Sequence, residues 1–527
     1  MNQRHKADNG FFSSEISRRD FLKNSMKGAA VIGIPLVLSP SARNILRAGT
    51  GDDDSTLKNY YAHFGVDPSI IRKVMEAALD NGGDYCDLFF EHTMTNNIGL
   101  EDKQVNRAVA SVEFGVGIRV IKGDSIGYSF TQEITPEAMK LAAKTAAAIA
   151  DGGKKVAPAD IVLHRTPDYY PVKTLWSDVT TTARIPILEK MNDLAFTADK
   201  RIIKVGCTLS DSESYILIAT SEGRIVHDYR PMLRLVINCN AEQNGKKENN
   251  SRSYAVRNGI EAISEARIAK IVADTVESTT RQFTAIQPEG GEMPVVLAKG
   301  SSGILLHEAI GHGMEADFNR KNESIFSDKI GKKVAESFVT IVDDGTMKGT
   351  RGAINVDDEA NDSQRTVLVE NGILRSYMHD RISAKFYSVP PTGNGRRESF
   401  KHPPIPRMRN TYMTAGPHTR EEILQSTKKG IIAEQFTNGQ VNIGPGDFTF
   451  YVKSGYLIED GKITRPIKDI NIIGNGPDVL GKIVMVADDF EIDDSGWTCG
   501  KGWQSAPVSL GLPTVKVSSI NVGGVKK

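Results

Sequence analysis

Apolar residues first recur at helical spacing after Asp67-Pro68, and this pattern predicts a helix that ends at Asn81-Gly82-Gly83. Asp67 can cap the first turn, and Pro68 suits the first helical position, where an N–H has no partner within the helix. A second capped helix is predicted from Thr135-Pro136-Glu137 to Gly152-Gly153. The stretch between them predicts strands over residues 85–91, 112–121 and 125–131. This part of the chain is therefore predicted to form an α/β layer.

The chain continues with a second mixture of helix and strand patterns, after which strand patterns predominate. Between about residues 170 and 284, the pattern predicts helices over 185–199 and 261–275 and strands over 215–220 and 233–239. The segment Gln287-Pro288-Glu289-Gly290-Gly291 marks a boundary, beyond which short β patterns and glycine turns predominate. We therefore predict an α+β protein with an N-terminal signal and linker over 1–55, an α/β domain over 56–169, a central α+β region over 170–290 and a β-rich domain over 291–527.

The N-terminal segment resembles an export signal rather than part of the fold. Residues 17–23 read Ser-Arg-Arg-Asp-Phe-Leu-Lys, which reproduces the twin-arginine signal, and the apolar run over 28–38 is too short to span a bilayer. Gly49 to Ser55, with three consecutive aspartates, is predicted to be a linker. We expect export in the folded state to the periplasm or another extracytoplasmic compartment, with no stable membrane span.

Composition narrows the classes of partner. The 65 basic and 65 acidic residues leave no net charge, and no dense Lys/Arg run predicts nucleic-acid binding. The acidic runs at 343–344 and 357–359 are predicted to be solvated turns rather than cation sites. Four widely separated cysteines form no CxxC pair, so no disulfide framework is indicated, and three of them stand in apolar contexts typical of a core: Cys86, Cys207 and Cys239.

The segment His307-Glu308-Ala309-Ile310-Gly311-His312 carries the strongest chemical signal. Two imidazoles and a carboxylate resemble the zinc-peptidase helix motif His-Glu-x-x-His, but the second histidine comes one residue later. Positions five apart on a regular helix are rotated by roughly 140°, against roughly 40° for positions four apart. Both rings can reach one metal only if the backbone makes a wide turn of the π type, which Gly311 and Gly313 would tolerate.

The surrounding sequence resembles the TldD/PmbA family of metallopeptidases, and within it the metal-binding TldD branch. The similarity spans most of the chain after the export signal and is strongest after Pro294. Five segments carry it: His307–Arg320, Pro406–Thr411, Tyr456–Ile463, Ile473–Pro477 and Thr498–Lys501. The resemblance implies zinc held by His307, His312 and Cys499, with Glu308 as the general base. Residues 291–527 would then be the catalytic metallopeptidase domain with its metal-binding helix.

The resemblance also implies substrates and partners. Family members act on small or unfolded peptides inside a dimer cavity, and the PmbA branch lacks the metal ligands and serves as a non-catalytic subunit. We therefore expect either a homodimer or a heterodimer with a PmbA-like subunit.

The local sequence supports Cys499 as the third ligand without settling the choice. Gly496 and Gly500 flank it and would let the backbone approach a metal, for which thiolate is a good ligand. Four other side chains could compete for the position: Glu315, His379, His402 and His418. Of these, His379 is more typical of a structural histidine.

Three arginines are candidates for binding substrate. Arg396, Arg397 and Arg407 lie in a segment rich in glycine and proline that is predicted to be a mobile loop. One of them could grip a peptide carboxylate, whereas the alternative is that they are solvated surface residues.

The predicted mechanism has Glu308 take a proton as a metal-activated water attacks a peptide carbonyl. Two rival functions stay open at this point. One is a catalytically silent scaffold or peptide-binding subunit, and the other is a metallohydrolase of non-peptide bonds.

Overall fold

The structure, a computed structural model, describes residues 54–150, 152 and 155–524. The predicted export signal lies outside these residues. The chain divides after His63, so helix α3 (Asp54–Phe64) is described on its own, and all the elements below belong to the part that follows the division.

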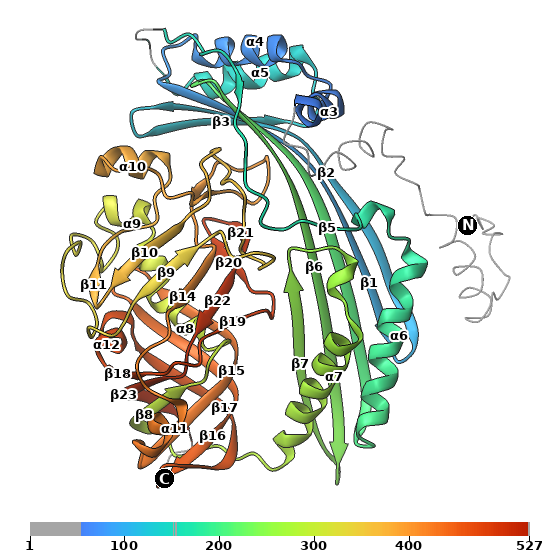
Figure 1. The fold of residues 1–527 in the computed structure, drawn as a ribbon, viewed down its shortest axis with the longest axis vertical. Coiled ribbons are helices and arrows are strands. Elements are labelled where there is room, and N and C mark those ends of the chain that lie inside the picture. Colours follow the sequence, from blue (N-terminus) through green and yellow to red (C-terminus); the bar gives the residue numbers. More distant parts are fainter. Residues whose placement is uncertain (1–53, 151, 153–154, 525–527) are drawn as a thin grey trace, which may run out of the picture. The chain divides into compact units, whose positions relative to one another are not determined.

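A large, mainly antiparallel sheet is built from both the N-terminal and the central parts of the chain (Figure 1). Its order is β3-β2-β1-β5-β6-β4, and β7 also pairs with β6. The strands are β1 (Tyr85–Glu101), β2 (Gln104–Lys122), β3 (Ser125–Thr131), β4 (Val162–Leu163), β5 (Ile202–Thr220), β6 (Arg224–Gln243) and β7 (Lys246–Val256). Because β1 pairs with β5 from Asp87↔Thr220 to Glu101↔Gly206, the expected boundary at 169/170 falls within a region that forms one sheet.

Two pairs of helices pack against this sheet. α4 (Pro68–Leu79) and α5 (Pro136–Ala147) begin at the predicted caps, where the side chains of Asp67 and Thr135 accept hydrogen bonds from Ile70 N and Ala138 N. α6 (Thr181–Ala198) and α7 (Glu265–Thr280) share an apolar core with the far half of the long strands. The two pairs therefore cover different parts of the same sheet (Figure 1).

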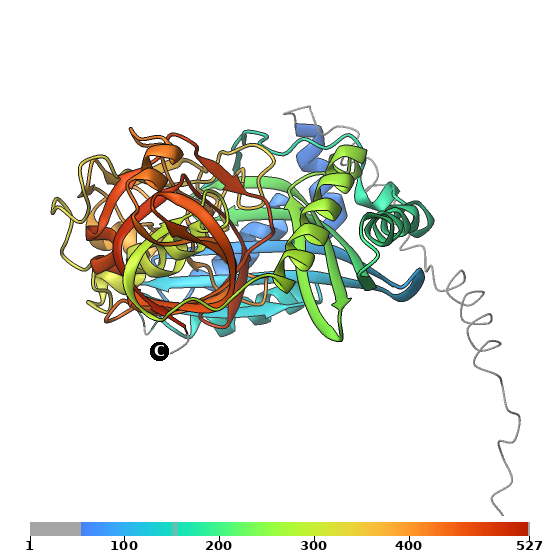
Figure 2. The ribbon, with the colours of Figure 1, turned by 90° about the horizontal axis from the view of Figure 1, so that it is seen from below.

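The C-terminal part contains two six-stranded sheets, ordered β17-β16-β15-β8-β23-β18 and β11-β10-β9-β14-β22-β19. The first uses β8 (Gly291–Leu297), β15 (Lys429–Asn442), β16 (Asp447–Glu459), β17 (Lys462–Asn475), β18 (Ile483–Val486) and β23 (Val515–Gly523). The second uses β9 (Ile341–Asp344), β10 (Arg365–Glu370), β11 (Ile373–Leu374), β14 (Asn410–Met413), β19 (Glu491–Asp493) and β22 (Ser509–Leu512). In Figure 2 the later strands of this part, coloured orange and red, curl into a rounded body.

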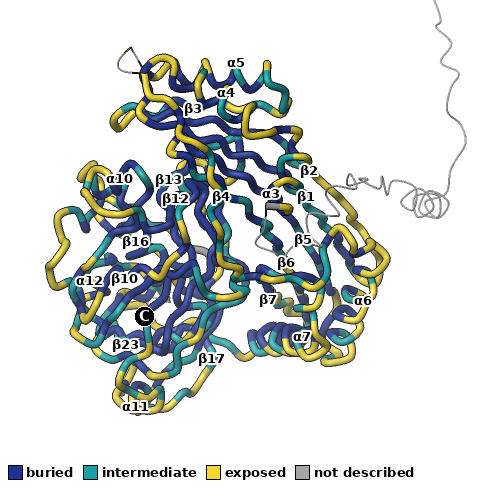
Figure 3. Tube along the Cα trace, turned by 45° about the horizontal axis from the view of Figure 1, so that its top comes forward, coloured by how far each residue is buried: buried dark blue, intermediate teal, exposed yellow. Residues whose placement is uncertain are grey.

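One apolar core joins the two C-terminal sheets to the segment that carries the predicted site. It contains Leu297 and Phe450 of the first sheet, Ile341 and Leu510 of the second, and Ile310 of the predicted metal-binding segment. Figure 3 shows that this region is mainly buried, whereas helices such as α6 and α11 (Arg420–Gln425) carry many exposed residues. The α+β prediction and the β-rich C-terminal region are confirmed.

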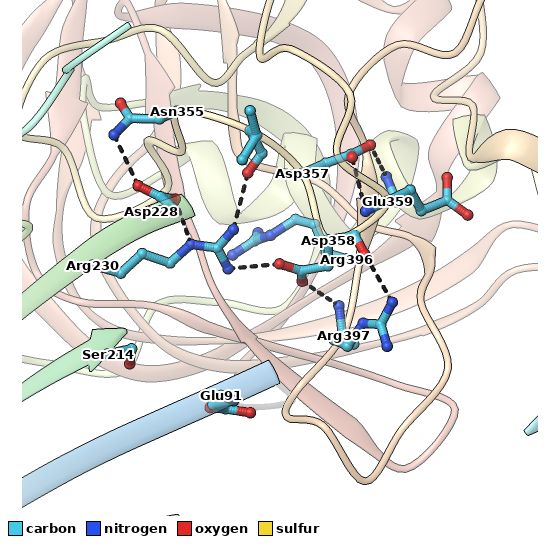
Figure 4. Close-up of polar contacts among 12 residues, drawn as sticks. Glu91, Ser214, Asp228, Arg230, Asn355, Asp357, Asp358, Glu359, Arg396 and Arg397 are labelled. Atoms are coloured by element: carbon cyan, nitrogen blue, oxygen red, sulfur yellow. Dashed lines mark hydrogen bonds and ion pairs between the residues drawn. The ribbon is translucent and has the colours of Figure 1, made fainter. Parts of the chain in front are cut away.

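Buried ion pairs connect the first sheet to the C-terminal region. Arg119 of β2 contacts both Asp87 of β1 and Glu359, and none of the three side chains is exposed. Arg230 of β6 lies between Asp228 and Asp358, with its nitrogens 2.7 Å and 2.6 Å from the two carboxylates (Figure 4).

The acidic run 357–359 is therefore not the solvated turn that its sequence predicted. The run at 343–344 is buried too, and Arg409 Nε lies 2.8 Å from Asp343 Oδ2. In both runs the compensating cations come from distant segments, and burying a carboxylate is tolerable only with such a partner.

Candidate metal centre

The His307 segment forms the wide turn that the five-residue spacing requires. α8 (Gly303–Leu306) leads into a π-helix, η4 (His307–Gly311), which is followed by η5 (His312–Met314) and α9 (Ala316–Arg320). The His312 N–H donates to the His307 carbonyl, which is an i to i+5 hydrogen bond. The predicted departure from a regular α-helix is confirmed.

The wide turn brings the two imidazoles together inside the protein. The ring centroids of His307 and His312 are 5.1 Å apart, the rings are nearly perpendicular, and both residues are buried. A straight helix would have directed the rings to different faces, so the backbone irregularity is what makes a shared ligand possible.

Cys499 completes a three-residue group. It lies on β20 (Thr498–Lys501), which pairs with β21 (Gln504–Pro507), and its Sγ is 3.3 Å from His312 Nε2. One possible ligand atom from each of His307, His312 and Cys499 lies within 4.8 Å of the others, and this is the one such group of His, Cys or acidic residues found in the described part of the chain.

The other candidates for the third ligand lie away from the three-residue group, except for Glu315, which contacts one of its members. His379 is buried beside Tyr377 and Tyr387, and burial lowers its pKa to about 4. His418 Nδ1 bonds with the backbone of Val486, whereas Glu315 bonds to the Nδ1 of His312, on the ring edge away from Cys499. No cluster found among the described residues includes His402.

The electrostatics of the group suit a metal. Burial alone would raise the pKa of the Cys499 thiol, but His312 and His307 lower it well below its usual range, which favours the thiolate that ligates metals. The buried His307 Nδ1 finds no hydrogen-bond partner among the described residues, which is costly unless something else binds it. Two imidazoles and a thiolate are a donor set that fits zinc.

Glu308 stands beside the ligands without belonging to their group. Its side chain is 21% exposed, against 6% for His312, and its Oε2 lies 3.7 Å from His312 Nε2. A carboxylate in this position could accept a proton from a water molecule beside the three possible ligands.

Comparison with known proteins identifies the family of the chain. Models of the PmbA/TldA metallopeptidase match domain 1 over residues 86–150, the central domain over 175–282 and the C-terminal domain over 290–524. A metalloprotease TldD homolog of Haemophilus influenzae is 39% identical over 449 residues, which cover 84% of this chain and 93% of that protein. The chain belongs to the PmbA/TldA metallopeptidase family. The prediction of a metallopeptidase is thereby confirmed.

Another relative matches part of the chain, and a solved structure shares its fold. A zinc metalloprotease TldD homolog of Saccharolobus solfataricus is 34% identical over 258 residues, 49% of this chain and 57% of that protein. The crystal structure of TldE from Thermococcus kodakarensis matches with a TM-score of 0.66 at 18% identity, covering 86% of this chain and all of that one. Among the described residues, no helix is long and apolar enough to cross a membrane.

Within this family fold, the three arginines predicted to bind substrate lie in the interior. Arg396 is in β12 (Gly395–Arg396), which pairs with β13 (Ile405–Pro406), and its guanidinium donates to the carbonyls of Met408 and Pro507. Arg397 contacts Asp87 and the Asp358 carbonyl, and Arg407 donates to the carbonyls of Cys499 and Gln504.

The segment around these arginines is therefore buried rather than an exposed loop, and the solvated alternative is wrong. Glycine and proline here allow close backbone packing, which a local pattern cannot distinguish from a surface loop. The substrate-binding role of the arginines stays a prediction, and each guanidinium already has partners within the protein.

The sequence interpretation missed Lys501, which contacts Glu315 and so reaches the metal centre indirectly. The alternation of side chains along a strand could have revealed this residue. Because side chains two apart on a strand lie on the same face, Lys501 must share a face of β20 with Cys499.

We predict that Gly476→Ala disturbs the π-helix. Gly476 begins α12 (Gly476–Gly481), and a Cβ there would collide with the carbonyl oxygen of Ala309. Overpacking of this kind costs roughly 1–3 kcal/mol, so the variant should unfold at lower urea concentration and bind zinc more weakly. Gly481→Ala is the matched control, because no atom lies within 4 Å of its added Cβ. Equal urea midpoints and zinc affinities for both variants would contradict the prediction.

Proposed function

We propose that this chain is a zinc-dependent peptidase that hydrolyses small or unfolded peptides. The observation that carries the proposal is the convergence of His307, His312 and Cys499 on one point, with Glu308 beside them. The names of relatives as metalloproteases, one of them a zinc metalloprotease, support the same chemistry.

The chain's own residues supply binding and proton transfer. His307, His312 and Cys499 would hold the zinc, which when bound activates water and polarises a peptide carbonyl. Glu308 would take the proton of the attacking water and pass it to the leaving amine, as a general base that becomes a general acid. Its partial exposure leaves the carboxylate accessible for both transfers.

The test combines metal analysis with peptide digestion on one preparation of the purified mature protein. We expect about one zinc per chain and cleavage of an unstructured peptide library that is lost with a chelator and restored by zinc. A preparation that folds and is supplied with zinc but binds none would favour the silent scaffold. Zinc-loaded protein that cleaves esters or other small substrates but no peptide would favour a hydrolase of non-peptide bonds.

We also propose that the active form is a dimer, either of this chain or with a PmbA-like subunit. The fold shared with TldE from Thermococcus kodakarensis is compatible with a partner of the same architecture. Light scattering of the purified chain separates the alternatives. A dimer mass for the chain alone supports the homodimer, and a monomer that gains mass only with a PmbA-like chain supports the heterodimer.

Export by the twin-arginine route is the remaining part of the proposal, and it rests on Arg18-Arg19 within the signal-like segment. We predict that Arg18→Lys/Arg19→Lys leaves the protein in the cytoplasm, because this pair is the part of the signal that the export machinery reads. Cell fractionation measures the outcome, with Arg47→Lys as a control nearby. Undiminished export of the double variant would refute the localisation.

A further inference from the structure

A buried lysine, Lys501, lies two residues after Cys499 on β20 and contacts the segment that follows His312. Lys501 Nζ lies 3.0 Å from Glu315 Oε2 and 2.7 Å from Asp317 Oδ1, and it donates to the Pro406 carbonyl at 2.9 Å. Its side chain is only 6% exposed. A lysine is rarely buried to this extent unless its charge is matched, and here two carboxylates match it.

Glu315 connects this lysine to His312. The same oxygen, Oε2, lies 2.9 Å from His312 Nδ1 and 3.0 Å from Lys501 Nζ, and the carboxylate is fully buried. A buried carboxylate needs a cationic partner, and Lys501 supplies one here. One carboxylate oxygen thus joins the lysine to the imidazole.

The hydrogen bond at Nδ1 sets which nitrogen of His312 is free. A neutral His312 that donates its Nδ1 hydrogen to Glu315 would keep a lone pair on Nε2, the nitrogen that lies 3.3 Å from Cys499 Sγ. His307 has no comparable support, because its Nδ1 finds no hydrogen-bond partner among the described residues. Of the two imidazole rings, the one that a hydrogen bond at Nδ1 orients is therefore that of His312.

The hairpin itself is fixed by other buried cations. Arg407 donates to the carbonyls of Cys499 and Gln504, one from each strand of the hairpin, and Arg396 donates to Pro507 at its end. These bonds hold the backbone of the hairpin formed by β20 and β21. Lys501 differs, because its ammonium group contacts Glu315 and Asp317, which follow His312 in the chain.

We propose that Lys501 and Glu315 are positioning residues that lock Cys499 and His312 into one rigid unit, so that the ligands from two distant segments are arranged for zinc before it binds. The inference rests on the proposed zinc site and deepens it. Neither residue belongs to the group of three possible ligands. Their effect passes through the orientation of His312 and the placement of the strand that bears Cys499.

The test measures the metal directly in full-length mature protein. Lys501→Met keeps the length of the side chain and removes its charge, and Glu315→Gln keeps a hydrogen-bond acceptor for His312 and removes the carboxylate. Loss of an outer partner of a metal ligand typically weakens metal binding by roughly 10–100-fold, and we expect each variant to lose zinc affinity within this range. The thiolate-to-metal charge-transfer band of the Co²⁺-substituted protein should also shift or weaken.

Lys453→Met provides a matched control, because Lys453 of β16 is also largely buried and pairs with a carboxylate, Asp469, outside the metal centre. We expect wild-type zinc affinity and an unchanged Co²⁺ spectrum for it. Lys501→Arg, which restores the positive charge, should recover part of the lost affinity. Thermal unfolding of the metal-free proteins identifies any variant that fails to fold. If Lys501→Met does not fold, the zinc affinity of Glu315→Gln decides the test.

The outcomes separate the inference from the proposed function. If folded Lys501→Met and Glu315→Gln both match wild type in zinc affinity and Co²⁺ spectrum, the positioning role is wrong while the zinc site stands. If wild type itself binds no zinc, the proposed function fails first.

Discussion

Glu308→Gln is expected to lower peptide cleavage by at least about 10²-fold while the zinc content stays close to that of wild type. Glutamine keeps the shape and the hydrogen-bonding oxygen of the side chain but cannot accept a proton at neutral pH. The zinc should stay because Glu308 lies outside the group of three ligands. Zinc analysis and turnover of an unstructured peptide should be measured on the same preparation.

The control for this change is Glu421→Gln, on the exposed first turn of α11, which should leave both quantities unchanged. Full turnover by zinc-loaded Glu308→Gln would show that another group takes the proton. Loss of zinc together with turnover would make Glu308 a ligand rather than a base.

Cys499→Ala is expected to remove zinc and activity together. The substitution deletes a ligand, so the loss of zinc affinity should exceed the roughly 10–100-fold that follows loss of an outer partner. Chelator competition gives the affinity, and peptide turnover at saturating zinc gives the activity. Because the side chain is small, the metal-free protein should still fold, which circular dichroism can verify.

Three buried cysteines outside the centre are natural controls for Cys499: Cys86 on β1, Cys207 on β5 and Cys239 on β6. Their alanine variants should keep wild-type zinc affinity even where lost packing lowers stability. Retention of zinc by Cys499→Ala at wild-type affinity would remove Cys499 from the ligand set.

The local geometry of the site could be predicted from sequence because it follows from spacing within one turn. Histidines five residues apart cannot face one metal from a regular α-helix, so their joint function required the π-helix that the structure contains. Cys499 differs, because 187 residues separate it from His312 and no spacing rule connects them. Its assignment came from the family resemblance.

Ion pairs between residues far apart in the sequence explain why the burial of several charged residues could not be predicted. The acidic run 357–359 and the arginines 396 and 397 each have the composition of a solvated surface. Their burial depends on partners such as Arg119 and Asp87, which lie in another sheet. Only the folded chain brings opposite charges together, so local polarity was a poor guide to exposure.

The strands of the first sheet were predicted too short for a related reason. The middle of β1, from Thr93 to Asn97, is polar and half-buried, so the apolar pattern stops near Glu91 although the strand continues to Glu101. Backbone pairing with β2 and β5 on both sides maintains the strand through this polar stretch. Hydrogen bonding between strands leaves no mark on side-chain periodicity.

The last strand of the chain lies inside its sheet rather than at the edge. β23 (Val515–Gly523) pairs with β8, the first strand of the C-terminal region, as well as with β17 and β18. During synthesis, the histidine half of the metal centre is therefore made long before Cys499 and the strand that closes the sheet behind it. A nascent chain that has not yet reached Cys499 lacks one of the three proposed ligands, so the complete site can form only after this late part of the chain has been made.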